Sequence, residues 1–189
     1  MHTLIVLAQL DAHTPFDRIE AHHLALTRDF VASHTDNFWR RNSADGHITA
    51  SAFVVNSAHS HALMLHHAAL DRWLQPGGHI DDTDQEPLSA AVRETLEETK
   101  VAATPATVNA GARPLLFDVD VHPIPARVKQ GTAEAAHLHY DLRYLLVAPT
   151  DTVVVSDESF AFRWVDIASL AAGAVDSGIA RMARKILEK

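Results

Sequence analysis

The 189-residue sequence contains no cysteine, which excludes disulfide bonds, thiolate zinc sites and cysteine nucleophiles. It also lacks long basic runs, because no stretch of lysine and arginine exceeds two residues. With 16 basic and 24 acidic residues, the formal net charge is −8. The chain therefore lacks the broad basic face that binds nucleic-acid phosphates, and we expect no nucleic-acid partner.

Long apolar runs are missing as well. No segment approaches the roughly 18 apolar residues of a membrane helix, and the run at residues 4–8 is too short for a signal peptide. We therefore expect a cytoplasmic protein with no membrane partner. Hydrophobic residues make up 47% and charged residues 21%, values typical of one globular domain that can bury a core.

The order of hydrophobic patterns predicts a mixed α/β fold. Residues 14–33 have helical spacing, with Thr14 as N-cap and Pro15 at the first helical position. A turn cluster at residues 42–46 then separates an N-terminal helical extension, residues 1–45, from a domain of residues 46–189. Within that domain we expect a strand hairpin (47–56, 62–66), a helix (87–99), three strands (114–122, 138–147, 160–165) and two helices (166–172, 177 to the end).

The helix at residues 87–99 carries three carboxylates on one side. Because each residue advances the helix by roughly 100°, Glu94, Glu97 and Glu98 fall within an arc of about 100°, while Thr95 and Leu96 are expected on the core side. Like charges at this spacing destabilise a helix, so a cation is expected between them. Mg²⁺ prefers oxygen ligands of this kind. The alternative is a solvated acidic helix face.

The context of the carboxylate helix favours the metal. A short strand near Trp73 ends in Gly77 and Gly78, and an acidic loop at residues 81–84 enters the helix. This arrangement resembles the Nudix hydrolase family, whose box is Gx5Ex7REUxEExGU and corresponds here to Gly78 and residues 93–101. The resemblance implies an α/β/α sandwich, a mixed sheet between helices, that hydrolyses the diphosphate linkage of a small nucleoside-diphosphate-type substrate.

Three positions depart from the family box. The first acid is Asp84 when counted from Gly78, but the position is Gln85 when counted back from Arg93. Thr95 stands at a position that is usually apolar, where Leu96 is expected to cover the core instead. Lys100 replaces the glycine that would end the helix in the left-handed conformation, at a cost of roughly 1 kcal/mol.

The resemblance also implies the roles of the box residues. Glu94, Glu97 and Glu98 would be catalytic and would bind Mg²⁺ or Mn²⁺, with the Gly77 carbonyl as a further ligand and Arg93 orienting the glutamates. The general base is left open among Glu98, Glu134 and Glu158. The implied partner is a small nucleotide-like molecule, and both a monomer and a homodimer are compatible with the sequence.

Histidines form a second candidate set. His137 and His139 alternate on one strand and share a face with Asp141 and Arg143. With His79 beside the box glycines and His122 on the preceding strand, they would form a substrate wall, an imidazole metal site or hydrogen-bonded structure. The substrate-binding residues that we predict are His79, Glu134, His137 and His139.

Two other uses of the same fold are weaker. A Nudix-fold sensor that binds a nucleotide without cleaving it would not need the intact carboxylate set. Isopentenyl-diphosphate isomerase relies on a catalytic cysteine, which this chain lacks. The acidic balance also argues against mRNA decapping.

Overall fold

The computed structural model describes residues 3–34, 37–41, 45–106, 115–129, 132–173 and 176–188, with the backbone alone at 127–129 and 132–134. At its centre β1 (Gly46–Val55) lies parallel to β9 (His137–Val147) along ten residue pairs. Antiparallel strands extend this pair into a mixed eight-stranded sheet. They are β2 (His61–His67), β3 (Arg72–Leu74), β4 (Gly77–His79), β5 (Thr104–Pro105), β6 (Leu116–Ile124) and β10 (Ser159–Asp166).

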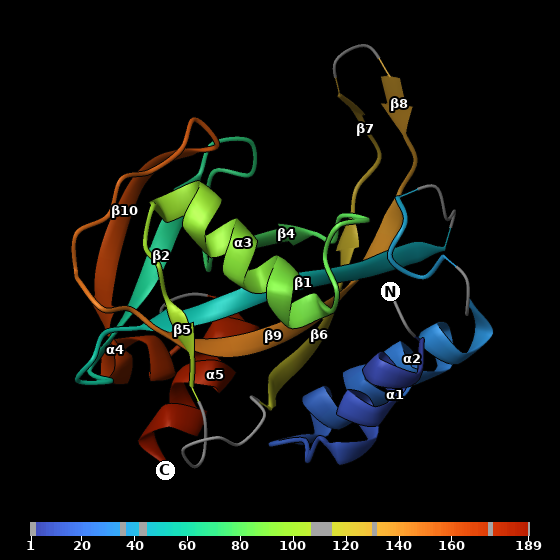
Figure 1. Cartoon of the computed structure of the whole chain (residues 1–189), viewed down its shortest axis with the longest axis horizontal. Coiled ribbons are helices and arrows are strands. Elements are labelled where there is room, and N and C mark those ends of the chain that lie inside the picture. The colour runs from blue at the N-terminus through green and yellow to red at the C-terminus, as the bar shows by residue number, and fades with distance from the viewer. Residues whose placement is uncertain are drawn as a thin grey trace.

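Helices cover both faces of this sheet (Figure 1). On one face lie α1 (Thr3–Ala12), α2 (Arg18–Ser33) and α3 (Pro87–Thr99), which share one apolar core. On the other face lie α4 (Ile167–Ala171) and α5 (Ser177–Leu187) over a second core. The expected α/β/α sandwich is therefore confirmed, with the two N-terminal helices placed beside α3.

Strand β1 shows how the sheet separates the two cores. Its ten residues are all buried, and successive side chains point to opposite faces. Ile48 and Val54 belong to the core under α3, whereas Phe53 and Val55 belong to the core under α4 and α5. A central strand covered on both faces needs apolar residues at nearly every position.

The N-terminal helices differ from the sequence expectation. The helix predicted from Thr14 begins only at Arg18, because Asp17 is the N-cap and accepts the Glu20 N–H at 2.8 Å. Thr14 and Pro15 lie in the connection between α1 and α2. An aspartate that reaches the third backbone amide satisfies a donor that the helix itself cannot pair.

Helix α2 covers the free edge of β6. Glu20 accepts the Val119 N–H at 3.3 Å, and His23 Nδ1 accepts the Val121 N–H at 3.2 Å. Lys185 of α5 contacts Glu20 at 2.6 Å, so both helical layers meet at this edge. Side-chain acceptors thus satisfy amides that would otherwise offer a template for strand pairing.

The two remaining strands lie outside the eight-stranded sheet. β7 (Arg127–Lys129) and β8 (Thr132–Glu134) form a separate hairpin that projects from the sheet (Figure 1). Residues 42–44 of the predicted turn and residue 114 of the predicted strand lie outside the described ranges. Within those ranges, none of the helices has the length and apolarity needed to cross a bilayer.

Candidate active site

Helix α3 has the bounds that the sequence predicts. Pro87 occupies the first helical position, and the Ser89 hydroxyl accepts the Glu86 N–H at 3.1 Å. At the other end Lys100 adopts the left-handed conformation, with φ 56°, and its N–H bonds the Leu96 carbonyl. The helix therefore ends as the glycine of the family box would end it, with a lysine in the strained position.

The core side of α3 differs from the prediction at one residue. Thr95 is fully buried, and its hydroxyl donates to the Ala91 carbonyl at 2.8 Å. Leu96, expected to cover the core, is 46% exposed. The threonine satisfies its own polar atom within the helix, so it can remain at the buried position and leave Leu96 outside.

The two box glycines form strand β4, not the end of the preceding strand. β4 pairs with β1, Ser51 opposite Gly77. Gly77 has φ 153°, and a Cβ there would overlap Ser51; a Cβ on Gly78 would lie 2.7 Å from the Glu94 carboxylate. Glycine at both positions lets this backbone approach the strand on one side and the helix carboxylates on the other.

The glutamates of α3 are held against this glycine strand. Glu98 is buried and accepts the Gly77 N–H at 2.9 Å. Burial, together with the nearby charges of Glu94, Glu158 and Glu97, raises the pKa of Glu98 to about 8, although the Gly77 hydrogen bond opposes this rise. Burial also raises the pKa of Glu94, opposed by Arg93. Carboxylates so destabilised in their charged form would gain from a hard divalent cation.

Arg93 organises the polar side of α3. It bonds Asp84 at 2.8 Å, Glu94 at 3.0 Å and Glu97 at 3.0 Å, and donates to the His79 carbonyl at 2.9 Å. The Asp84 hydrogen bond is the main reason that the pKa of Arg93 is raised. Asp84 is buried and residue 85 is exposed, so Asp84 is the residue of the two that contacts Arg93.

Glu158 joins this group from the turn before β10. Its charge raises the pKa of both Glu94 and Glu98, and its segment is tied to α3 where the Ser156 N–H donates to the Glu98 carbonyl at 2.9 Å. Of the three predicted general bases, Glu98 and Glu158 thus lie together. Glu134 is in β8, and its side chain lies outside the described part of the structure.

The predicted histidines also lie together. His137 and His139 lie in β9, His122 stands opposite His139 in β6, and His79 is in β4. The structure adds His47 of β1, directly beside His139. We call these five residues the histidine cluster; their neighbouring ring centroids are 4.7–5.5 Å apart.

The sequence patterns did not point to His47. The available signal was the polar alternation of His47, Thr49 and Ser51 in an otherwise apolar strand. Burial, with a smaller contribution from the neighbouring histidines, lowers the pKa of His139 to about 2. A hollow of about 440 Å³ adjoins the cluster at His137, with Pro123 and Leu138 in its lining.

A buried ionic network continues from the cluster along the same sheet face. Asp141 accepts the hydroxyls of Thr49 at 3.1 Å and Ser51 at 2.7 Å and bonds Arg143 at 2.9 Å. Arg143 in turn bonds Asp120 at 2.9 Å. Asp141 and Arg143 share the histidine face, as expected, but the structure buries them as paired charges. Such a network fixes side chains on three strands, β1, β9 and β6.

The family comparison agrees with this geometry. The model of the NUDIX domain matches residues 45–186. The chain belongs to the Nudix hydrolase family. Its members are generally pyrophosphohydrolases, and they typically use a divalent metal. Among curated proteins, no sequence matches the chain.

Solved structures share the fold at low sequence identity. A Nudix-family hydrolase from Clostridium perfringens is 23% identical with a TM-score of 0.54, and the E. coli dihydroneopterin triphosphate pyrophosphohydrolase is 17% identical with a TM-score of 0.57. Each match covers 75% of this chain and 96% of the other. The NUDIX domain of Shewanella oneidensis NrtR, in complex with ADP ribose, is 14% identical with a TM-score of 0.51, covering 83% and 96%.

Proposed function

We propose that this Nudix protein is a Mg²⁺- or Mn²⁺-dependent hydrolase that cleaves the diphosphate linkage of a small nucleoside-diphosphate-type substrate. The observation that carries the proposal is the packing of buried Glu98 and half-buried Glu94 against the glycine strand. Hard divalent cations bind oxygen ligands such as these carboxylates. The pKa of Glu98, raised to about 8, shows that its charged form lacks a compensating positive charge among the described residues.

In this proposal Glu94, Glu97 and Glu98 hold the metal. The Gly77 carbonyl joins them, because the Gly77 N–H points to Glu98 and the N–H and carbonyl of one strand residue point to the same side. When bound, the metal would neutralise the diphosphate and lower the pKa of a bound water. Arg93 positions Glu94 and Glu97 through its paired hydrogen bonds.

The proton acceptor in the reaction is proposed to be a carboxylate of the same group. Glu98 and Glu158 are both candidates, because they lie close enough for the charge of Glu158 to raise the pKa of Glu98. His79, His137 and His139 are proposed to contact the substrate from the sheet face next to β4. Glu134 keeps its proposed substrate-binding role on the projecting hairpin.

The substrate class is supported by the ligands named for two structural neighbours. One is a pyrophosphohydrolase of dihydroneopterin triphosphate, and the other binds ADP ribose. Both ligands contain linked phosphates. For the domain arrangement, we propose a catalytic unit of residues 46–189 and a helical extension of residues 1–45 that covers the β6 edge.

The test is a hydrolysis screen with Mg²⁺ and with Mn²⁺. Nucleotide sugars, dinucleoside polyphosphates, ADP-ribose, NADH and nucleoside triphosphates would be followed by chromatography and phosphate release. We expect a monophosphate product from at least one of them, and no turnover in excess chelator. Tight binding of a nucleotide without any turnover would instead identify a sensor, and undiminished turnover in chelator would contradict the metal requirement.

A further inference from the structure

The histidine cluster brings together imidazoles from four neighbouring strands. Five of the 14 histidines in the chain gather here. They come from β4, β1, β9 and β6, which are distant in sequence but consecutive in the sheet. The register of these strands, not the local sequence, therefore creates the cluster.

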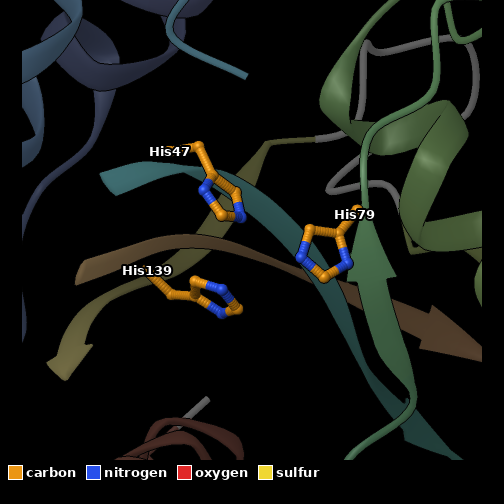
Figure 2. Close-up of side chains that lie close together, drawn as sticks. All are labelled: His47, His79 and His139. Atoms are coloured by element: carbon orange, nitrogen blue, oxygen red, sulfur yellow. The ribbon is translucent and has the colours of Figure 1, made fainter. Parts of the chain in front are cut away.

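Three of the rings face a common space. His47 and His139 are directly paired across β1 and β9, and His79 pairs with Thr49, one step along the same face of β1. Figure 2 shows the three imidazoles pointing toward one another from their separate strands. One ring nitrogen from each lies within 4.8 Å of the other two.

That spacing is close to a metal-bound arrangement. A zinc–nitrogen distance of about 2.0–2.1 Å in tetrahedral geometry places two ligand nitrogens about 3.3 Å apart. Rotations of the imidazole rings about their side-chain bonds can supply the remaining approach of about 1.5 Å or less. The backbone needs no rearrangement, because the strand ladder already places all three side chains on one face.

The surroundings suit neutral imidazole ligands. The Nε2 atom of His139 is buried and has no hydrogen-bond partner among the described residues. His137 Nδ1 lies 2.8 Å from the Ala135 carbonyl, which only accepts, so this nitrogen carries the proton and leaves Nε2 basic. Asp120 contacts His122 Nδ1 at 3.2 Å. His137 and His122 flank the three rings that face the common space, and these hydrogen bonds hold them beside it.

We propose that His47, His79 and His139 bind one transition-metal ion of the Zn²⁺ type, separate from the carboxylate site of α3. Nitrogen ligands distinguish this site from the oxygen ligands that Mg²⁺ prefers. The two sites share strand β4, because His79 follows Gly78, which lies against Glu94. Three histidine ligands leave a coordination position open for water or for an oxygen of the substrate.

The test is a zinc-binding measurement on the full chain without a histidine tag. The protein is stripped with chelator, saturated with Mg²⁺ to fill the carboxylates, and titrated with Zn²⁺; bound zinc is counted by elemental analysis after gel filtration. We expect one Zn²⁺ per chain. His79→Gln and His139→Gln should each weaken zinc binding more than about 100-fold, because loss of an outer partner alone weakens metal binding by about 10–100-fold.

Two control variants separate this site from the rest of the molecule. His22→Gln changes an exposed histidine of α2 and should leave zinc binding unchanged. Glu98→Gln alters the carboxylate site and should also retain the ion. Loss of zinc in Glu98→Gln, or full retention in both His79→Gln and His139→Gln, would overturn the proposal.

X-ray absorption spectroscopy of the zinc-loaded wild type identifies the zinc ligands directly, so this test does not require variants that could fold poorly. We expect at least three imidazole nitrogens at about 2.0 Å from zinc. A shell made of oxygen ligands, or the absence of stoichiometric zinc, would contradict the site and leave the histidines as a polar wall. Because the readouts are metal content and ligand type, this result is independent of whether the α3 carboxylates hydrolyse a diphosphate.

Discussion

Glu98 is the residue on which the proposed chemistry depends most. It is buried, it bonds the Gly77 backbone, and its carboxylate is crowded by Glu94 and Glu158. A group in this position destabilises the folded protein when it is charged and unpaired. A bound cation would remove this cost by pairing with the charged carboxylate.

Glutamine variants test this balance between repulsion and metal binding. In metal-free protein, Glu97→Gln and Glu98→Gln should melt at the wild-type temperature or slightly above it, because Glu97→Gln removes a like charge and Glu98→Gln removes the cost of burying an ionisable carboxylate. With Mg²⁺ at 100 times its dissociation constant, wild type should gain about 2.7 kcal/mol and become the most stable. Thermal melts with and without Mg²⁺ give the ranking of wild type and the variants by melting temperature under each condition.

An exposed carboxylate supplies the matched control for these melts. Asp29→Asn changes a side chain on the outer surface of α2 and should follow wild type with and without Mg²⁺. Unchanged metal-induced stabilisation in Glu98→Gln would mean that Glu98 does not bind the metal.

Individual side chains were predictable where local spacing determines them. Glu94, Glu97 and Glu98 share one helix side because of helical geometry alone. The choice between Asp84 and Gln85 needed the structure, because a loop can place either residue beside Arg93. His47 was missed for a similar reason, since only strand pairing brings it beside His139.

At the scale of elements, α3 was predicted most accurately. Its start at Pro87 and its end at Thr99 follow from a proline that fits the first turn and an amphipathic repeat between them. Strand β4 was not predicted, because two glycines resemble a turn when their partner strand is unknown. The start of α2 was misplaced because Thr14 and Asp17 are both good N-caps, and packing selects the second.

The C-terminus of α3 offers a test of backbone strain. Lys100 has φ 56°, a conformation that glycine adopts without a Cβ clash. Lys100→Gly should therefore raise the free energy of unfolding by roughly 1 kcal/mol. Lys100→Ala keeps the Cβ and should show no such gain. Denaturant unfolding of the three proteins measures the difference, and a glycine variant less stable than the alanine variant would contradict this account of the helix end.

At the scale of the whole molecule, the N-terminal helices are bound to the sheet through a buried charge. Glu20 contacts His13 at 2.7 Å and Lys185 at 2.6 Å while it covers the β6 edge. Burial opposes its ionisation, but these hydrogen bonds lower the pKa of Glu20 to about 2. One side chain thus joins the α1–α2 connection, α2, β6 and α5.

Glu20→Gln should destabilise the protein by about 1.5–3 kcal/mol at neutral pH, because it removes a charged acceptor of Lys185 and leaves Asp118 as its ionic partner. The depressed pKa means that the carboxylate stabilises fully above about pH 4.5 and loses this effect as pH falls toward about 2. The difference in unfolding free energy between variant and wild type should therefore narrow over that range. Denaturant unfolding at a series of pH values measures it.

The exposed pair of Asp11 and Arg28 provides the control for Glu20. Asp11→Asn should lower the unfolding free energy by less than about 1 kcal/mol. Equal effects of Asp11→Asn and Glu20→Gln at neutral pH would show that the buried contact does not attach the N-terminal helices.

The layer order of the whole molecule was predictable from the Nudix resemblance and the alternating patterns, whereas the attachment of the N-terminal helices was not. Helical spacing shows that residues 14–33 have an apolar side, but not which surface it covers. Phe30 stacks on Tyr140 at 4.2 Å, and Gln9 bonds Tyr144 at 2.6 Å. These contacts join segments more than 100 residues apart. The hydrophobic spacing within either segment therefore could not predict them.

The most direct test of the account is the Mg²⁺-dependent rate of diphosphate hydrolysis in ¹⁸O-labelled water for wild type, Glu98→Gln and Asp29→Asn. We expect wild type and Asp29→Asn to release monophosphate carrying ¹⁸O at equal rates. Glu98→Gln should be slower in kcat by about 10²–10³-fold or more, the scale of losing an electrostatic contact to the transition state. A Glu98→Gln rate equal to wild type would contradict the proposed role of the α3 carboxylates.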